Sequence, residues 1–467
     1  MNCGKIKKRE SVVYFYKKVI VMSTKLSRVI LICSIACSQA VAHDLPVFYR
    51  AAVLDGQPGK SVDDWHSTLS ISYLQGETSH AWNEHGHKCG LLDAWGQLDV
   101  TQLGVGVQSK VAPLTTYWND SGTGSFDTAT FTGNDGKVSI AGHSETKELS
   151  LNLRQNLFSG FYLFGYVPVR EIKNNRITPT YLGTNADVQA FLGTNFSGDF
   201  ATILSAYGYR PLTTSYRKTE VSDTLVGVGW QGIDTTSFDI IDSLSGGGEI
   251  GVTIPFGAQQ KQNCIASVPT GYNGHWGIKA QLAGEVGLWK FLGFGAATSA
   301  TMFFREERTI HMKTDEDQPG IIALDSGYAQ VDHGSLWSVS GYAKITPAAM
   351  VSCYVGASFV RQEKTELEVR DDVFLSTVVA NSLIPDEDGN VLAPLVSKDE
   401  VVNSDERFQA WEMYTLHLKA TVDMSSKIKS FFAPAVSFQY SLPLAGKHVF
   451  PSDVMSGTFD ANLQWKF

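Results

Sequence analysis

A short stretch holds the densest set of side chains in the sequence that could bind a metal ion. It contains His80, Glu84, His85, His87 and Cys89. A His-x-His pair in extended chain places both imidazoles on one face, and imidazole together with thiolate suits Zn²⁺ or Cu²⁺. We therefore take His85, His87 and Cys89 as a candidate metal site. The alternative is a solvated loop, because the sequence shows no second ligand cluster.

Motifs for catalysis or for a bound nucleotide are weak. The sequence has no Gly-x-Ser-x-Gly elbow and no His-Glu-x-x-His helix. The glycine-rich stretches 227–232 and 246–251 match a dinucleotide pattern, but neither opens a helix in a βαβ unit, so tight turns or a lumen wall explain them better. His417 is the one candidate for a hydrolase. We expect neither enzymatic activity nor a cofactor.

Many segments of the chain alternate between apolar and polar residues. Residues 458–467 do so without an exception, with Phe459 and Phe467 on the apolar face and Asp460 on the polar face. Residues 276–288 show the same period over a length that would span a bilayer as a strand tilted by about 40°. Period-two alternation predicts strands that have one apolar and one polar face.

The polar faces of these strands supply the candidates for a water-filled interior. In a membrane barrel the polar face of each strand points into the lumen. Lys344 belongs with them as part of a basic wall opposite acidic loops, an arrangement that would set up a transverse field. The pore-lining candidates are Lys279, Gln281, Glu285, His417, Lys419, Asp423 and Lys466.

The alternating segments predict an all-β fold, namely a transmembrane antiparallel up-and-down barrel of about twelve strands. An even number lets both ends of the chain lie on the periplasmic side, with short periplasmic turns and long external loops. A further hairpin within 76–146, from 98–107 and 129–140, would give fourteen strands. The segments are 65–75, 147–155, 160–172, 222–232, 247–256, 274–288, 290–306, 333–346, 349–364, 408–424, 427–443 and 454–467.

One connection does not fit the expected pattern. Residues 233–246 fall on the periplasmic side but are too many for a short turn, and 238–244 have apolar residues at helical spacing. We therefore expect a helical element in this connection.

The N-terminus predicts export. Lys25 and Arg28 precede an apolar run of about 14 residues, shorter than the roughly 20 that a membrane anchor needs. Residues 40–42, Ala-Val-Ala, offer the small side chains that signal peptidase accepts. We expect a signal peptide over 1–42, with Met22 as an alternative start of translation, and a single barrel domain over 43–467.

Removing this leader changes the charge and the cysteine content. Eight of the 38 basic residues and one of the 47 acidic residues lie in 1–42, which leaves 30 and 46 and a net charge of −16. Such a chain has no basic surface for nucleic acid, and its field would favour cations. Cys89, Cys264 and Cys353 remain, so at most one internal disulfide can form.

The final strand, which ends in Phe467, resembles the C-terminal signature of bacterial outer-membrane barrels, and the whole pattern is similar to porins and major outer-membrane proteins. The resemblance implies an outer-membrane location and contact with lipid. It also implies recognition of Phe467 by the barrel-assembly machinery, and a pore for small hydrophilic solutes or ions, which a homotrimer could form. Two alternatives stay open: a surface structural or adhesion barrel whose loops bind a partner without conducting, and a barrel hydrolase.

Overall fold

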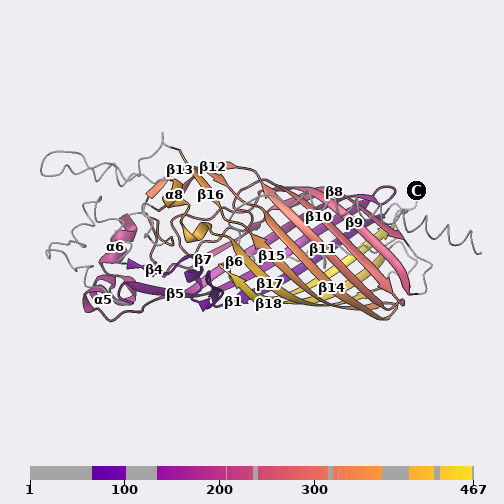
Figure 1. Cartoon of the computed structure of the whole chain (residues 1–467), viewed down its shortest axis with the longest axis horizontal. Coiled ribbons are helices and arrows are strands. Elements are labelled where there is room, and N and C mark those ends of the chain that lie inside the picture. The colour runs from indigo at the N-terminus through magenta and orange to yellow at the C-terminus, as the bar shows by residue number, and fades with distance from the viewer. Residues whose placement is uncertain are drawn as a thin grey trace, which may run out of the picture. The chain divides into compact units, whose positions relative to one another are not determined.

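The computed structural model describes residues 66–100, 134–206, 208–234, 240–313, 318, 320–323, 325–370, 399–424 and 432–464. Twelve long antiparallel strands form a closed barrel, and Figure 1 shows them slanting around it. The barrel strands are β1 (His66–Thr78), β5 (Lys137–Asn156), β6 (Phe161–Tyr181), β8 (Thr224–Asp234), β9 (Ile241–Ile254), β10 (Gly277–Leu288), β11 (Leu292–Phe303), β14 (Leu336–Ala348), β15 (Val351–Gln362), β17 (Trp411–Asp423), β18 (Phe432–Lys447) and β19 (Asp453–Gln464).

Each strand pairs with its neighbours along the chain, and β19 pairs with β1 to close the barrel. Each of the twelve predicted segments overlaps one barrel strand, which confirms the predicted fold class and strand number. The fourteen-strand alternative is wrong, because Leu98–Asp99 forms only a two-residue strand (β4) against β5, and Ile140 belongs to β5 itself. Residues 101–133 lie outside the described part of the chain.

The prediction of a helical element in the connection 233–246 is not borne out by its described residues. β8 continues to Asp234 and β9 begins at Ile241, so most of the supposed connection is strand. Ile241 and Leu244 both belong to β9, whose register against β10 shifts beside Ile241, while 235–239 lie outside the described residues. The strand is favoured over a helix here because each residue added to β9 forms backbone hydrogen bonds with the neighbouring strands β8 and β10.

The alternation of side chains separates an apolar outer face from a polar inner face. In β1, Ile71 is 45% exposed while the adjacent Ser72 is only 5% exposed. The outer positions of β5, β8 and β18 likewise carry exposed Leu151, Val228 and Phe438. An apolar belt on every barrel strand is stable only against lipid, so the barrel is a transmembrane one.

The two ends of the barrel differ. At the end where β1 begins and β19 ends, hereafter the turn end, the connections are short: 157–160, 289–291 and 349–350. Ser159, Trp289 and Lys290 adopt positive φ there, as tight hairpin turns require. Five of the six connections at the opposite end, hereafter the loop end, are long, as the sequence predicts. The sixth, between β18 and β19, has only five residues, 448–452, because the predicted long connection 444–453 is largely part of β18.

The long connections fold into a cap with its own apolar cores. α5 (Ala186–Leu192), α6 (Asp199–Ala206) and the 3₁₀ helix Leu92–Trp95 contribute to one core, which includes Phe200, Leu92 and Phe450. A second core fills the space between α8 (Asp399–Val402) and the sheet of β12 (Glu306–Met312), β13 (Asp325–Asp332) and β16 (Glu366–Val369). Within the described residues, no helix is long and apolar enough to cross a membrane.

Candidate functional site

The inner face of the barrel carries the polar residues predicted from the sequence. Strand register is the test, because directly paired residues point to the same side of a sheet. On β10, Gln281 is buried, whereas Ile278, which has the opposite parity, is exposed. On β17, His417 is buried beside the exposed Leu418. By the same parity, Lys279, Glu285, Lys419 and Asp423 lie on the inner face. Lys466 and Phe467 lie outside the described residues.

A tyrosine, a glycine and a glutamate form a row across β6, β8 and β9. Tyr162 pairs directly with Gly229, and Gly229 pairs with Glu249. The tyrosine ring lies over the glycine, where a Cβ would overlap it, and its hydroxyl donates to Glu249 at 2.7 Å. The guanidinium of Arg154 stands over the same ring, 3.5 Å from its centroid. Glycine is required on β8 because any side chain would displace the ring.

The same arrangement recurs across β14, β11 and β10. Tyr342 pairs with Gly295, which pairs with Glu285, and a Cβ on Gly295 would overlap the Tyr342 ring. The Tyr342 hydroxyl donates to Glu285, and the ammonium of Lys344 lies 3.0 Å from the other oxygen of this carboxylate. Each row thus places a buried phenol, a carboxylate and a neighbouring cation on the inner wall.

Two lysines flank a buried tyrosine next to this second row. Lys344, Tyr354 and Lys419 are directly paired on β14, β15 and β17. The two ammonium groups lie 5.8 and 5.9 Å from the centroid of the Tyr354 ring, within the range of a cation–π contact. The Tyr354 ring also packs at 5.7 Å from that of Tyr342.

His417 lies in the middle of the wall between two serines. Ser358 Oγ is 2.7 Å from its Nε2 and Ser441 Oγ is 2.9 Å from its Nδ1. Gln439 donates to the same Ser441 hydroxyl at 3.0 Å. A hydrolytic triad would hold the imidazole with a carboxylate, whereas here a hydroxyl stands in that position. The geometry therefore fits a hydrogen-bonded lumen histidine.

A buried apolar layer, hereafter the mouth cluster, fills the inner face at the loop end. Trp411 is anchored there by its indole N–H, which donates to Gln362 Oε1 at 2.6 Å. Tyr272 and Phe303 pack against this layer. The mouth cluster consists of Trp82, Leu336, Val360, Trp411, Met413 and Val449. Its members come from strands on one side of the barrel and from loops beside β1 and β18.

The connection between β9 and β10, residues 255–276, contacts the inner face of β6 at the loop end. Arg170 on β6 donates to the carbonyl of Thr270 at 2.6 Å, and Asn174 donates to that of Ala266 at 2.7 Å. Arg170 is itself paired with the buried carboxylate of Glu148 at 2.9 Å. Farther along, the His275 ring stacks on that of His333 at 4.1 Å. This loop and the mouth cluster thus place packed side chains on the inner face at the loop end.

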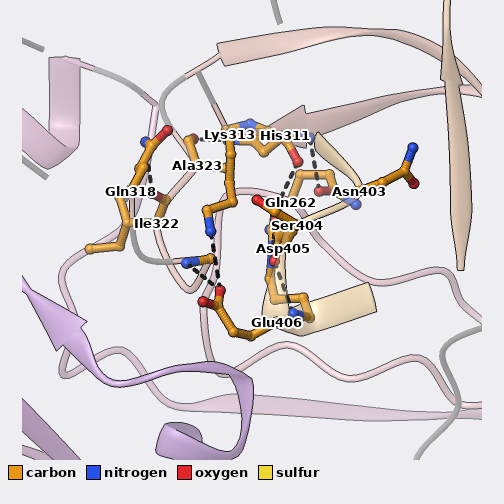
Figure 2. Close-up of polar contacts among 12 residues, drawn as sticks. Gln262, His311, Lys313, Gln318, Ile322, Ala323, Asn403, Ser404, Asp405 and Glu406 are labelled. Atoms are coloured by element: carbon orange, nitrogen blue, oxygen red, sulfur yellow. Dashed lines mark hydrogen bonds and ion pairs between the residues drawn. The ribbon is translucent and has the colours of Figure 1, made fainter. Parts of the chain in front are cut away.

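Polar contacts join connections of the cap to one another, and Figure 2 shows several of them. Asp405 is fully buried, and Arg407 donates both to it, at 2.7 Å, and to the carbonyl of His311, at 2.8 Å. Lys313 lies 3.4 Å from Glu406. His311 Nδ1 is 2.9 Å from the hydroxyl of Tyr209. Burial lowers the pKa of His311 to about 4, with Arg407 adding to the effect.

The predicted metal ligands are not gathered around a common point. His85 lies 3.4 Å from Glu84, and both side chains are largely exposed. The rings of His85 and His87 are 6.2 Å apart, and burial with Asp93 nearby raises the pKa of Cys89 to about 12. Among the described residues no group of three His, Cys, Asp or Glu side chains is placed to hold a metal ion. The metal site therefore stays a prediction without support from the geometry.

Sequence reasoning missed the three wall tyrosines and the pairing of Arg154 with Tyr162. Alternation along β5 and β9 puts Arg154 and Glu249 on the polar face of each strand, but an aromatic residue on an inner face cannot be distinguished by pattern from an outer apolar one. The sequence signal for such a ring is a tyrosine at a polar-face position of one predicted strand together with glycines at polar-face positions of the next predicted strand. Register decides which glycine meets which ring, and register is not visible in one sequence.

The fold and its wall define the class: a closed transmembrane β-barrel of the outer-membrane type, which agrees with the predicted location. No protein-family model and no curated protein sequence matches the chain. An outer membrane channel from Pseudomonas putida F1 is similar over 87% of this chain and 97% of that chain, with a TM-score of 0.42 and 9% identity.

Two further solved structures are similar at the same low level. The translocator domain of autotransporter NalP from Neisseria meningitidis matches 89% of this chain and 92% of its own, with a TM-score of 0.32 and 7% identity. The Pseudomonas putida toluene transporter TodX matches 92% and 95%, with a TM-score of 0.29 and 10% identity. At these values nothing follows for the solute of this chain.

Proposed function

We propose that the protein is an outer-membrane channel for small hydrophilic solutes, with the turn end facing the periplasm. The observation that carries this proposal is the inner wall, where ionisable and hydroxyl side chains such as Glu285, Lys344 and Lys419 line the barrel below the mouth cluster. A barrel that served only as an anchor would have no need to carry these charges on its inner wall.

In the proposed mechanism the lumen is open to water from the turn end and is closed at the loop end. The Lys344 side chain retains 26% exposure and those of Glu249 and Lys419 are half-buried, whereas Val360 and Val449 in the mouth cluster are fully buried. Passage therefore requires the mouth cluster and the 255–276 loop to move. No catalytic step and no cofactor form part of this proposal.

Planar-bilayer recording of the refolded, heat-modifiable protein tests the proposal. We expect stepwise conductance with long closed periods, because passage in the proposed mechanism requires the mouth cluster and the 255–276 loop to move. Absence of steps at high protein load, from protein whose gel mobility shows that it is folded, would contradict it. A homotrimer and recognition of Phe467 by the assembly machinery remain predictions, which cross-linking and deletion of the last residue would address.

A second candidate function has an observation of its own. The cap has two apolar cores and a helix-bearing surface, which is more structure than solute passage demands. An adhesion or structural barrel would use this cap to bind a partner and would not conduct. Binding of cells or envelope extracts that is lost when the cap is trimmed, together with silent bilayers, would favour it. The hydrolase alternative predicts ester hydrolysis that disappears in His417→Gln.

A further inference from the structure

Arg154 and Arg170, both on the inner wall, are held in different ways. Arg170 on β6 is buried, and it donates from Nε to Glu148 at 2.9 Å and from Nη1 to the carbonyl of Thr270 at 2.6 Å. Arg154 on β5 is half-buried, and within the described residues its one hydrogen bond runs from Nε to the side-chain oxygen of Asn156, at 3.1 Å. The Nη1 and Nη2 donors of Arg154 are therefore available to a ligand.

The guanidinium of Arg154 is held in one orientation. Its plane stands over the Tyr162 ring, 3.5 Å from the centroid, while Asn156 accepts from Nε. The ring is itself fixed, because it is buried over Gly229 and its hydroxyl donates to Glu249 at 2.7 Å. These contacts leave the end of the fork, where Nη1 and Nη2 lie side by side. Two parallel N–H groups there match the two oxygens of one carboxylate.

Glu249 supplies a negative charge on the same stretch of wall. Its side chain is half-buried, and Oε1 accepts from the Tyr162 hydroxyl. In the second row, Lys344 and Glu285 form a direct ion pair at 3.0 Å. Arg154 and Glu249 form no such pair within the described residues, because one lies over the face of the ring and the other at its hydroxyl. The second oxygen of Glu249 can therefore accept from a ligand.

This stretch of wall lies near the turn end. Asn156 ends β5 and Tyr162 is the second residue of β6, and the two flank the short hairpin 157–160. The mouth cluster and the 255–276 loop lie at the other end of the barrel. In the proposed mechanism water enters from the turn end, so a solute reaches Arg154 and Glu249 without any movement of the cap.

The two charges favour a solute that carries both signs. A simple anion would be attracted by Arg154 and repelled by Glu249, and a simple cation would meet the reverse. A molecule with a carboxylate and an ammonium group satisfies both residues, because a carboxylate accepts from the guanidinium fork and an ammonium donates to a carboxylate. The complementarity comes from the placement of the charges and does not require a net charge at the site.

We propose that Arg154 and Glu249 bind a small zwitterion of the amino-acid class, with its carboxylate on the Nη edge of Arg154 and its ammonium on Glu249. Tyr162 is a positioning residue, because its ring orients the guanidinium and keeps the two charges apart. The inference deepens the proposed channel function by naming a class of solute, and it rests on that function for the passage of the solute.

Saturation-transfer NMR titrations of the detergent-folded barrel test the binding. The probes are two zwitterions, glycine and 4-aminobutyrate, and two molecules with a single charge, acetate and methylammonium. At least one zwitterion should bind about tenfold more tightly than either single-charge probe, because the second charge-assisted contact is then added. Acetate binding as tightly as both zwitterions, or no binding of any probe, would overturn the proposal.

Single substitutions separate the two contacts. Arg154→Gln and Glu249→Gln should each weaken binding of the zwitterion about tenfold or more. Arg154→Lys keeps the charge without the fork and should retain only part of the affinity. Glu249→Gln keeps an oxygen that can accept from Tyr162, so the wall should stay intact. Heat-modifiable gel mobility confirms the folding of each variant.

The matched control is Lys364→Gln/Glu366→Gln. It removes one cation and one acid that form an exposed ion pair outside the barrel strands, and it should bind the zwitterion as the wild type does. Unchanged binding in Arg154→Gln or in Glu249→Gln, or equal losses in the control, would contradict the assignment.

Liposome swelling separates this site from the channel function. Proteoliposomes with the wild type should swell in the bound zwitterion, and those with Arg154→Gln/Glu249→Gln should swell more slowly in it but equally fast in a neutral sugar. Binding in micelles with liposomes that admit neither solute would leave the zwitterion site standing and remove the channel. Swelling in both solutes without binding of either zwitterion would do the reverse.

Discussion

The guanidinium of Arg154 lies over the ring of Tyr162, and that ring in turn lies over Gly229 on the next strand. A methyl group at Gly229 would overlap the ring, so Gly229→Ala should force the ring and Arg154 off the wall. We expect a loss of about 1–3 kcal/mol in the free energy of unfolding, typical of overpacking. Urea unfolding in detergent micelles measures it.

The matched control for this substitution is Gly165→Ala on β6. Its added Cβ would lie 3.9 Å from the nearest atom, the Val226 side chain, which is ordinary contact. The unfolding midpoint should stay close to that of the wild type. Equal losses in the two variants would mean that the ring does not depend on the glycine.

Glu285→Gln should make the lumen more anion-selective. The amide keeps a carbonyl that can accept from Tyr342, but the negative charge beside Lys344 disappears. The reversal potential under a KCl gradient should move further toward that of chloride. Asp187→Asn, an exposed change on α5 with the same loss of charge, serves as the control and should not move it. A shift of the same size in the control would assign the effect to overall charge.

Met413→Ala should loosen the mouth cluster and raise the conductance or the open time. Met413 is buried among Trp411, Val360 and their neighbours, so the truncation leaves a cavity and should cost about 2–5 kcal/mol of stability. Tyr414→Ala, next to it on the outer face, is the control, because that side chain is exposed to lipid. Channels that open no more often in Met413→Ala than in the control would show that the closure lies elsewhere.

The cap should loosen in acid because His311 is buried in its neutral form. Its pKa falls from 6.5 when unfolded to about 4 when folded, so between these values the unfolded cap binds more protons and stability falls as the pH falls. The penalty is absent above pH 6.5 and reaches about 2 kcal/mol at pH 5. Hydrogen exchange of β12 between pH 7 and 5 measures it.

The control for this pH dependence is His311→Gln, whose side chain does not titrate. Its exchange should vary less with pH than that of the wild type, even if it is faster throughout. His275, whose pKa is lowered to about 3 by burial and by Arg308, stays in the variant and leaves a residual dependence. An unchanged profile in His311→Gln would assign the titration to other groups.

The thiol of Cys89 should react slowly with maleimide at neutral pH. Burial, together with the nearby Asp93, raises its pKa to about 12, so the reactive thiolate is rarer by roughly a thousandfold than in an unfolded chain. Peptide mapping by mass spectrometry before and after denaturation distinguishes Cys89 from the other cysteines. Rapid labelling of the folded protein would contradict this prediction. Heat released on titration with Zn²⁺ would support a metal site at His85, His87 and Cys89.

The sequence by itself determined the strands, because membrane barrels impose a period of two that local residues reveal. Phe459 to Gln464 and Gln281 to Val286 alternate visibly, and short or long connections then set which end is which. The inner-face assignments of Lys279, Glu285 and Lys419 followed from parity alone. Parity, however, says which face a residue occupies and not which residue on the next strand lies beside it.

Only the tertiary structure decided the register, and with it the site. Lys344, Tyr354 and Lys419 lie ten or more residues apart in the sequence, and a slip of one position would move each side chain to the opposite face. The packing of the mouth cluster was equally hidden, because Trp82, Trp411 and Val449 come from segments far apart in the chain. Such packing depends on three-dimensional proximity, which no local pattern encodes.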